Sequence, residues 1–308
     1  MTHIYKVSLF IELGLKLSNS SSAYAFIVPL AITSSDSMAA LHELLLQGCE
    51  DISISTYSNR PKKIFANADQ RVAILLAAKT GRPNEVVNTT KVNKRYSNKT
   101  IDDVINGLEY VNSKNFVRLG RIPKVGTNTE LDILEKIFSI KNGIKELMDE
   151  NGSPVYYRAA GGRYYNVVTT YPTGSTQEKK LMVNAEYQNL VGALLTSNLF
   201  YWFLHIYSDQ LHIKSYELEL FPVPAKSFSD DDLRHIERIY KAYLDDLEKN
   251  AKQKLGDYVH VDSFKEYVVR KSKHYIDELD KAIGKAYGLN KTEIDFLINY
   301  DLEFRLSE

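Results

Sequence analysis

Three short strand-like runs in the first 80 residues constrain the fold of this chain more than any other feature. The runs are residues 23–30 (AYAFIVPL), 51–57 (DISISTY) and 71–78 (RVAILLAA). The first and third are almost wholly apolar, as expected of strands covered on both faces, whereas the second alternates between apolar and polar residues. Residues 3–17 and 38–46 carry apolar residues at helical spacing. Together these patterns predict an α/β segment.

The same segment predicts an incomplete sheet. No glycine-rich strand–turn–helix pattern precedes the first run, and the other two runs are joined by the polar residues 58–70. This arrangement indicates a strand pair at the edge of a sheet. Two or three strands bury too little apolar surface to be stable alone. We therefore expect a partial domain that another polypeptide completes, and a small independent α/β domain is the alternative.

The rest of the chain divides into an irregular middle and a helical end. Residues 80–224 mix helical and strand patterns, with a predicted hairpin at 155–165 (VYYRAAGGRYY) and a buried helix or helix pair at 186–207. Ser229 and the three acids after it mark a helix start. The helices predicted beyond it are residues 233–252, 264–287, which Gly288 ends, and 290–299.

Charge is distributed unevenly along a chain whose formal net charge is zero. Residues 60–163 hold 19 Lys and Arg against 11 Asp and Glu, a net charge of +8, whereas residues 227–308 hold 14 against 18, a net charge of −4. This asymmetry permits a polyanionic partner for the middle of the chain. An ordinary basic surface explains the charge equally well.

Cysteine content and hydropathy bear on the cellular compartment. The single Cys49 excludes an intrachain disulfide framework and a cysteine-based zinc site, which fits the reducing cytoplasm. Residues 1–18 lack the pattern of a signal peptide. Residues 190–207 are interrupted by polar side chains and favour a buried helix over a membrane span. We expect a cytoplasmic protein with no membrane partner.

Five segments, taken in order, resemble one family. Residues 4–29, ending in FIVP, and the helix at 38–46 resemble the stretch after the catalytic loop of gamma-class adenine-N6 DNA methyltransferases. Residues 58–76 resemble the hairpin late in the sheet of those enzymes. Two further segments, 194–211 (LLTSNLFYWFLHIYSDQL) and 276–306, resemble Type IIG restriction–modification proteins. The chain therefore looks like the carboxy-terminal half of such a protein.

The resemblance implies a fold of three parts. Residues 1–85 would form the late part of a Rossmann-like methyltransferase sheet, residues 86–225 a mixed α+β target-recognition domain that binds double-stranded DNA, and residues 226–308 a helical carboxy-terminal region. The family's glycine motif for S-adenosylmethionine and its Asn/Asp-Pro-Pro-Tyr catalytic loop have no counterpart here, and the sequence contains no Pro-Pro pair. We therefore expect no cofactor in this chain, and a protein partner that supplies both.

Residues of the predicted hairpin loop match positions that matter in this family. Methylation of adenine within a duplex requires the base to be flipped out, and an aromatic residue of the late hairpin supplies one stacking face. By position that residue is Phe65, and the alternative is a phenylalanine buried against the sheet. Arg60, Lys62 and Lys63 precede it and are candidate phosphate contacts, or a solvated basic loop.

Sequence reading is expected from the middle region. Arginine pairs with guanine edges in the major groove, and tyrosine contacts bases or phosphates. The candidates are Tyr156, Tyr157, Arg158, Arg163, Tyr164 and Tyr165, with Lys91, Lys94 and Arg95 adding positive charge. For any single tyrosine, a place in the core of the hairpin is the alternative.

Other chemistry has little support in the sequence. Ser208, Asp209 and His212 follow no nucleophile elbow, so we expect no hydrolytic triad. His205 has no ligand cluster around it, so we expect no metal site. The first hypothesis is the DNA-recognition half of a split or truncated adenine methyltransferase of a restriction–modification or phage-defence system. A non-catalytic DNA-binding specificity subunit and an inactive fragment are the alternatives.

Overall fold

The computed structural model describes residues 2–65, 69–118, 120–160, 167–210, 212–255 and 263–306. The chain forms two compact units. Unit 1 contains residues 1–132 and 205–209, and unit 2 contains residues 133–204 and 210–308.

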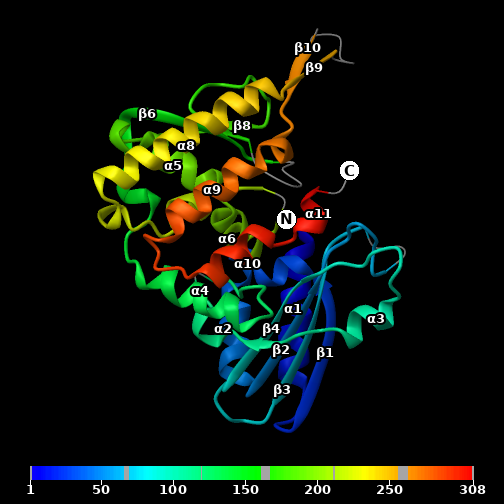
Figure 1. Ribbon diagram of the computed structural model, residues 1–308. Coiled ribbons are helices and arrows are strands. Elements are labelled where there is room, and N and C mark those ends of the chain that lie inside the picture. Colours follow the sequence, from blue (N-terminus) through cyan, green and yellow to red (C-terminus); the bar gives the residue numbers. More distant parts are fainter. Residues whose placement is uncertain are drawn as a thin grey trace. The chain divides into compact units, whose positions relative to one another are not determined.

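Unit 1 is built on a five-stranded mixed sheet (Figure 1). Its strands are β1 Ser22–Pro29, β2 Asp51–Tyr57, β3 Val72–Lys79, β4 Val86–Asn93 and β5 Val111–Asn112, in the spatial order β1-β3-β2-β4-β5. β3 is antiparallel to both β1 and β2, so those two strands run parallel to each other on either side of it. β4 pairs parallel with β2, and β5 pairs antiparallel with β4.

The described residues of unit 1 form helices at both predicted positions and at two others. They are α1 Thr2–Leu17, α2 Ala39–Gly48, α3 Ile101–Asn106 and the start of α4 Asn128–Ser139, with 3-10 turns at Leu30–Thr33, Asp36–Met38 and Lys114–Phe116. The predicted helices at 3–17 and 38–46 and all three predicted strands are confirmed. The sheet continues beyond residue 85 through β4 and β5.

Two expectations about these strands are wrong. β2 and β3 do pair with each other, but β1 and β4 flank them, so the pair lies inside the sheet and not at its edge. β1 is the edge strand, and it is covered on one face only, because its exposed and half-buried residues alternate and Ile27 is 61% exposed. The prediction that both faces of this strand are covered is therefore not met by the described residues.

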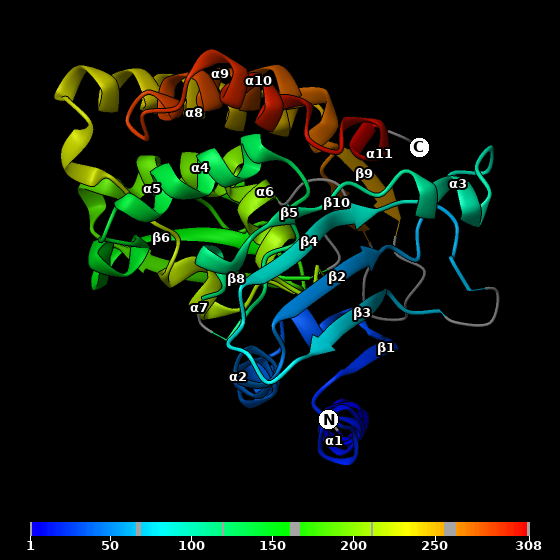
Figure 2. The same ribbon diagram turned by 90° about the horizontal axis from the view of Figure 1, so that it is seen from below.

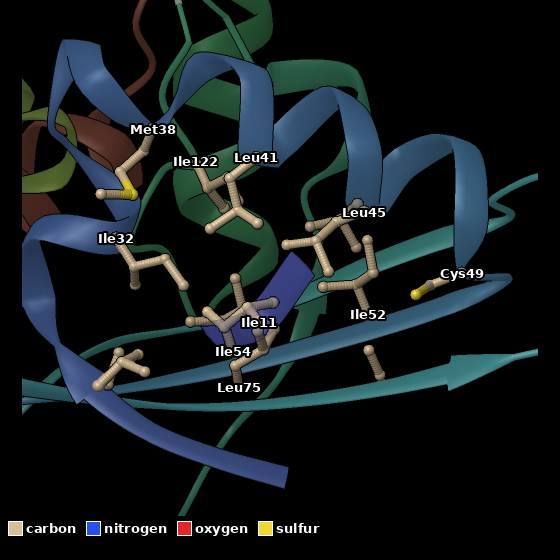
Figure 3. Close-up of a cluster of buried hydrophobic side chains, with 14 of the residues drawn as sticks. Ile11, Ile32, Met38, Leu41, Leu45, Cys49, Ile52, Ile54, Leu75 and Ile122 are labelled. Atoms are coloured by element: carbon tan, nitrogen blue, oxygen red, sulfur yellow. The ribbon is translucent and has the colours of Figure 1, made fainter. Parts of the chain in front are cut away.

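The core of unit 1 lies between one face of the sheet and the two helices α1 and α2 (Figures 2 and 3). Ile11 of α1 and Leu45 of α2 pack against Ile54 of β2 and Leu75 of β3, and all four side chains are at most 1% exposed. Helical spacing on one side and strand alternation on the other place these residues face to face. Burial of each such side chain contributes about 1.5–3 kcal/mol.

Unit 2 combines a three-stranded antiparallel sheet with helices. Its strands are β6 Met148–Arg158, β7 Val168–Thr169 and β8 Glu178–Val183, in the order β7-β6-β8, and a separate hairpin of β9 Lys252–Leu255 and β10 Ser263–Glu266. Its helices are α5 Gln188–Thr196, α6 Asn198–Tyr207, whose last residues belong to unit 1, α7 Ser215–Glu219, α8 Asp230–Lys249, α9 Lys273–Gly284, α10 Lys291–Asn299 and α11 Leu302–Leu306.

Most of the helical end agrees with the sequence. Ser229 accepts a hydrogen bond from the backbone N–H of Asp232 and forms a capping box with it at the start of α8. Gly288 has a φ of +68°, a conformation that suits glycine after a helix. The predicted helix at 264–287 is wrong in its first third, because residues 263–266 form β10 and α9 begins only at Lys273. Although the spacing of apolar residues in this stretch permits a helix, residues 263–266 pair with β9 as a strand.

The apolar residues before Ser208 form two helices that are bent relative to each other. Of the two predicted alternatives, a single buried helix or a helix pair, the pair is confirmed. Almost every residue of α5 is buried. Among the described residues, no single helix has the length and apolar character needed to cross a membrane. Ala185–Thr196 and Asn198–Tyr207 meet that criterion only when taken together, and they are bent by 63°.

A buried carboxylate lies at the start of α6. Asp280 accepts hydrogen bonds from the backbone N–H groups of Asn198 and Leu199, both at 3.1 Å, and from the Asn198 side-chain amide at 2.6 Å. Arg305 donates to the Asn198 side-chain oxygen, and its guanidinium lies 4.0 Å from the ring centre of Tyr201. Burial raises the pKa of Asp280 to about 7 and outweighs the donors that favour its charged form.

This raised pKa predicts a pH-dependent stability of the chain. A carboxyl whose pKa is raised by folding favours the folded state fully below its unfolded pKa, and that contribution is lost as pH rises through about 7. Between pH 5 and pH 8 the free energy of unfolding should fall by on the order of 2–3 kcal/mol more in the wild type than in Asp280→Asn. Urea denaturation at both pH values measures this difference. Asp295→Asn changes an exposed acid of α10 and should keep the wild-type dependence; equal slopes for wild type and Asp280→Asn would contradict the prediction.

Candidate nucleic-acid interface

The ends of β2 and β4 bring two groups of predicted residues together in unit 1. Because the two strands are parallel, their carboxyl ends lie at the same edge of the sheet. The backbone N–H of Ser58 donates to the Asn93 carbonyl at 2.9 Å, and that of Lys62 donates to the Arg95 carbonyl at 3.1 Å. The loop after β2 is thus held along the segment that follows β4.

A β-bulge places Lys91 beside the same edge. The register of β2 against β4 shifts between Ile54 and Thr56. The backbone N–H of Thr56 donates to the Thr90 hydroxyl at 3.1 Å, and the Thr56 hydroxyl donates to the Lys91 carbonyl at 3.0 Å. The Lys91 side chain is exposed. Bulges commonly redirect side chains next to functional sites.

We call the resulting set the cationic rim. It consists of Arg60, Lys62, Lys63, Lys91, Lys94 and Arg95. Arg60, Lys62 and Lys91 are exposed, and within the described ranges none of the three has an acidic partner within 4 Å. Lys63 pairs with Asp69 at 3.2 Å, a solvent-exposed contact that stabilises the fold little. Arg60, Lys62 and Lys91 are therefore available to contact phosphates.

Phe65 is not buried against the sheet. Its neighbour Ile64 is 5% exposed and packs with Tyr57, Val72 and Val104, a small cluster on the sheet face opposite to the main core. This cluster anchors the root of the loop. Phe65 itself is 36% exposed, so its ring is available to another molecule. Its stacking role remains a prediction.

The candidate residues of unit 2 divide between two faces of β6. Tyr157 is 5% exposed, and burial raises the pKa of its hydroxyl, so this residue has a packing role in the sheet. Tyr156 and Arg158 lie on the other face, where Tyr156 is half-buried and Arg158 is exposed. Arg163, Tyr164 and Tyr165 lie outside the described residues.

One residue on this face was missed by the sequence. Lys180 of β8 is exposed and pairs directly with Tyr156 across the sheet, which places both side chains on the same face. Residues 178–183 (EKKLMV) do not alternate between polar and apolar types, and the partner of this strand is not encoded locally. In the described part of the chain, no group of three or more histidine, cysteine or acidic residues could hold a metal ion.

Comparisons with known proteins give distant similarity only. No family model matches the chain, and no curated protein matches it. Among solved structures it is similar to the Type IIL restriction–modification enzyme MmeI, solved in complex with DNA, with 12% identity and a TM-score of 0.48 over 97% of this chain and 51% of that one. It is also similar to the Type IIG restriction endonuclease BpuSI, with 11% identity and a TM-score of 0.30 over 95% of this chain and 49% of that one.

The chain thus spans about half the length of both structures.

The cationic rim predicts salt-dependent binding of duplex DNA by the isolated chain. Arg60→Glu and Lys62→Glu should each weaken binding on any sequence, because phosphates carry no sequence information. Each lost phosphate contact should reduce the slope of log K against log salt by about 0.9. Fluorescence anisotropy at several salt concentrations measures both effects. Lys281→Glu changes an exposed lysine of α9 and serves as the matched control; equal losses in all three variants would contradict a specific role for the rim.

Proposed function

We propose that this chain is the DNA-recognition half of a split or truncated site-specific DNA adenine-N6 methyltransferase, part of a cytoplasmic restriction–modification or phage-defence system. It would methylate only with a partner that carries the S-adenosylmethionine site and the catalytic loop, and would bind no cofactor itself. The proposal rests on the ordered series of sequence motifs. Its main structural support is the position of Phe65, exposed on a loop that also carries Arg60 and Lys62, neither of which has an acidic partner within 4 Å among the described residues.

The geometry of this loop suits an extruded base. A flipped adenine needs an apolar face to replace the stacking lost in the duplex, and base–aromatic stacking contributes about 1–3 kcal/mol. Ile64 is fixed in its apolar cluster, which limits the movement of Phe65 next to it. Lys62 and Arg60 lie a few residues away and would hold the phosphates on either side of the base.

Sequence recognition is assigned to unit 2. Tyr156, Arg158 and Lys180 share the exposed face of the β6–β8 pair. The Arg158 Nε donates to the Ala160 carbonyl at 2.9 Å, which leaves its terminal nitrogens to bind a guanine edge or a phosphate. The exposed face of the β6–β8 pair would contact bases, and the cationic rim would bind the phosphate backbone.

Methyl transfer in a reconstituted complex tests the proposal. The chain is combined with a host polypeptide that carries the glycine motif and a Pro-Pro-Tyr loop, and label transfer from tritiated S-adenosylmethionine to duplex DNA is measured. Phe65→Ala should lower the rate by roughly 10- to 100-fold, the equivalent of about 1–3 kcal/mol of stacking. Phe65→Trp should retain most of the activity.

Tyr110→Ala, which removes another exposed aromatic ring of unit 1, is the control and should leave the rate unchanged. Full activity of Phe65→Ala would refute the role of this ring. Specific duplex binding without any methyl transfer would instead favour a non-catalytic specificity subunit.

A further inference from the structure

Helix α1 has two apolar sides, and only one of them is covered within this chain. Ile11 and Leu15 face the sheet and belong to the main core. A second stripe runs along the opposite side of the helix, at the spacing that places residues on one face. Its members are Leu9 (62% exposed), Phe10 (69%), Leu13 (49%) and Leu17 (77%). A surface helix normally places polar residues there, so this stripe requires another explanation.

The outer edge of β1 is open. β1 ends the strand order of the sheet, and no other described strand pairs with its outer side (Figure 2). The backbone N–H of Leu30 donates to the Arg71 carbonyl at 3.0 Å in continuation of the β1–β3 register. Because bonding alternates along an antiparallel ladder, the peptide groups of Ala23, Ala25 and Ile27 point away from β3.

This open edge lacks the features that protect most edge strands. The sequence of β1 (SAYAFIVP) contains no charged residue, and its single proline is the last residue. Natural edge strands are usually blunted by lysine, by an internal proline or by a covering loop. An uncharged edge with outward-facing donors and acceptors fits the addition of a further strand.

The second face of the sheet is also uncovered next to β1. Ile27 and Leu76 are 61% and 44% exposed on this face. We call these two residues, the four exposed residues of α1 and the open edge of β1 the β1 flank. Taking about 200 Å² for a fully exposed large apolar residue, its six side chains expose roughly 700 Å², close to the 800 Å² or so that each partner contributes to a standard interface.

We propose that the β1 flank docks a second, α/β polypeptide, whose edge strand pairs with β1 and whose apolar side chains cover both the exposed stripe of α1 and the sheet face that carries Ile27 and Leu76. This inference rests on the proposed function and names the surface that its partner occupies. A second copy of this chain fits less well. Antiparallel pairing of two β1 strands places the two uncovered faces on the same side, so Ile27 and Leu76 would stay exposed in both copies.

The experiment compares variants of the tagged chain purified natively from its host. Ala25→Pro removes one outward-facing N–H without touching the β1–β3 ladder, and Leu13→Glu charges the exposed stripe of α1. Ile105→Lys changes an apolar residue of α3 that is 44% exposed and lies outside the flank, and is the control. The wild type and Ile105→Lys should purify with an equimolar second polypeptide, and the two flank variants should retain at least tenfold less of it.

Hydrogen exchange locates the contact. The amides of Ala23, Ala25 and Ile27 should exchange at least tenfold more slowly in the complex than in the chain stripped of its partner. Retention of the partner by both flank variants, purification as a monomer alone, or a dimer of this chain that the flank variants dissociate would each overturn the inference.

Methyl transfer separates the two proposals. A polypeptide that docks on the flank but adds no methyltransferase activity would leave the docking surface intact and refute the proposed function. If both flank variants keep a stable complex and its methyl transfer, the docking surface is refuted and the proposed function stands.

Discussion

The parallel pairing of β2 with β4 is the constraint on which the candidate interface depends. It joins the loop that carries Phe65 to the segment that carries Lys94 and Arg95, through backbone hydrogen bonds from Ser58 and Lys62. Without this pairing, cations about 30 positions apart in the sequence would belong to separate surfaces. Their mutual repulsion is tolerated because the backbone fixes the loops while Arg60, Lys62 and Lys91 are exposed to water, which screens their charges.

Buried polar groups stabilise the other unit in a different way. Asp280 satisfies the first N–H groups of α6, which would otherwise lack partners at a buried helix start. The hydrogen bond from Arg305 to Asn198 ties the carboxy-terminal helix α11 to the same point. Such a network is costly when incomplete, so it favours one packing of α6, α9 and α11 over alternatives.

The local spacing of apolar residues was enough to predict most helices and strands of this fold, but not which strands pair with each other. Period-2 and period-3.6 spacing located α1, α2, β2 and α8 to within a few residues. Strand order is a long-range property: nothing in residues 51–57 specifies that β3 lies on one side and β4 on the other. The prediction for 264–272 failed for a related reason: its spacing permits a helix, but pairing with β9 makes residues up to Glu266 a strand, and α9 begins only at Lys273.

The candidate site shows the same limit at the level of single residues. The sequence identified the loop with Phe65 and its cations, but Ile64 and Phe65 are adjacent apolar residues, and only packing decides which is buried. Tyr156 and Tyr157 are divided in the same way by the two faces of β6. Lys180 could not be found, because its importance comes from a cross-strand neighbour 24 positions away.

Strand direction links the two surfaces of unit 1. β1 and β2 are both antiparallel to β3, and Pro29 and Tyr57 are both register partners of Val72. β1 therefore ends at the same edge of the sheet as β2 and β4, where the cationic rim lies. A strand added parallel to β1 would also end there, and the loop that follows it would lie at the edge that carries Phe65. The proposed active site, divided between two polypeptides, would need this arrangement, because a partner loop that holds a flipped base on one side would have to meet the Phe65 ring on the other.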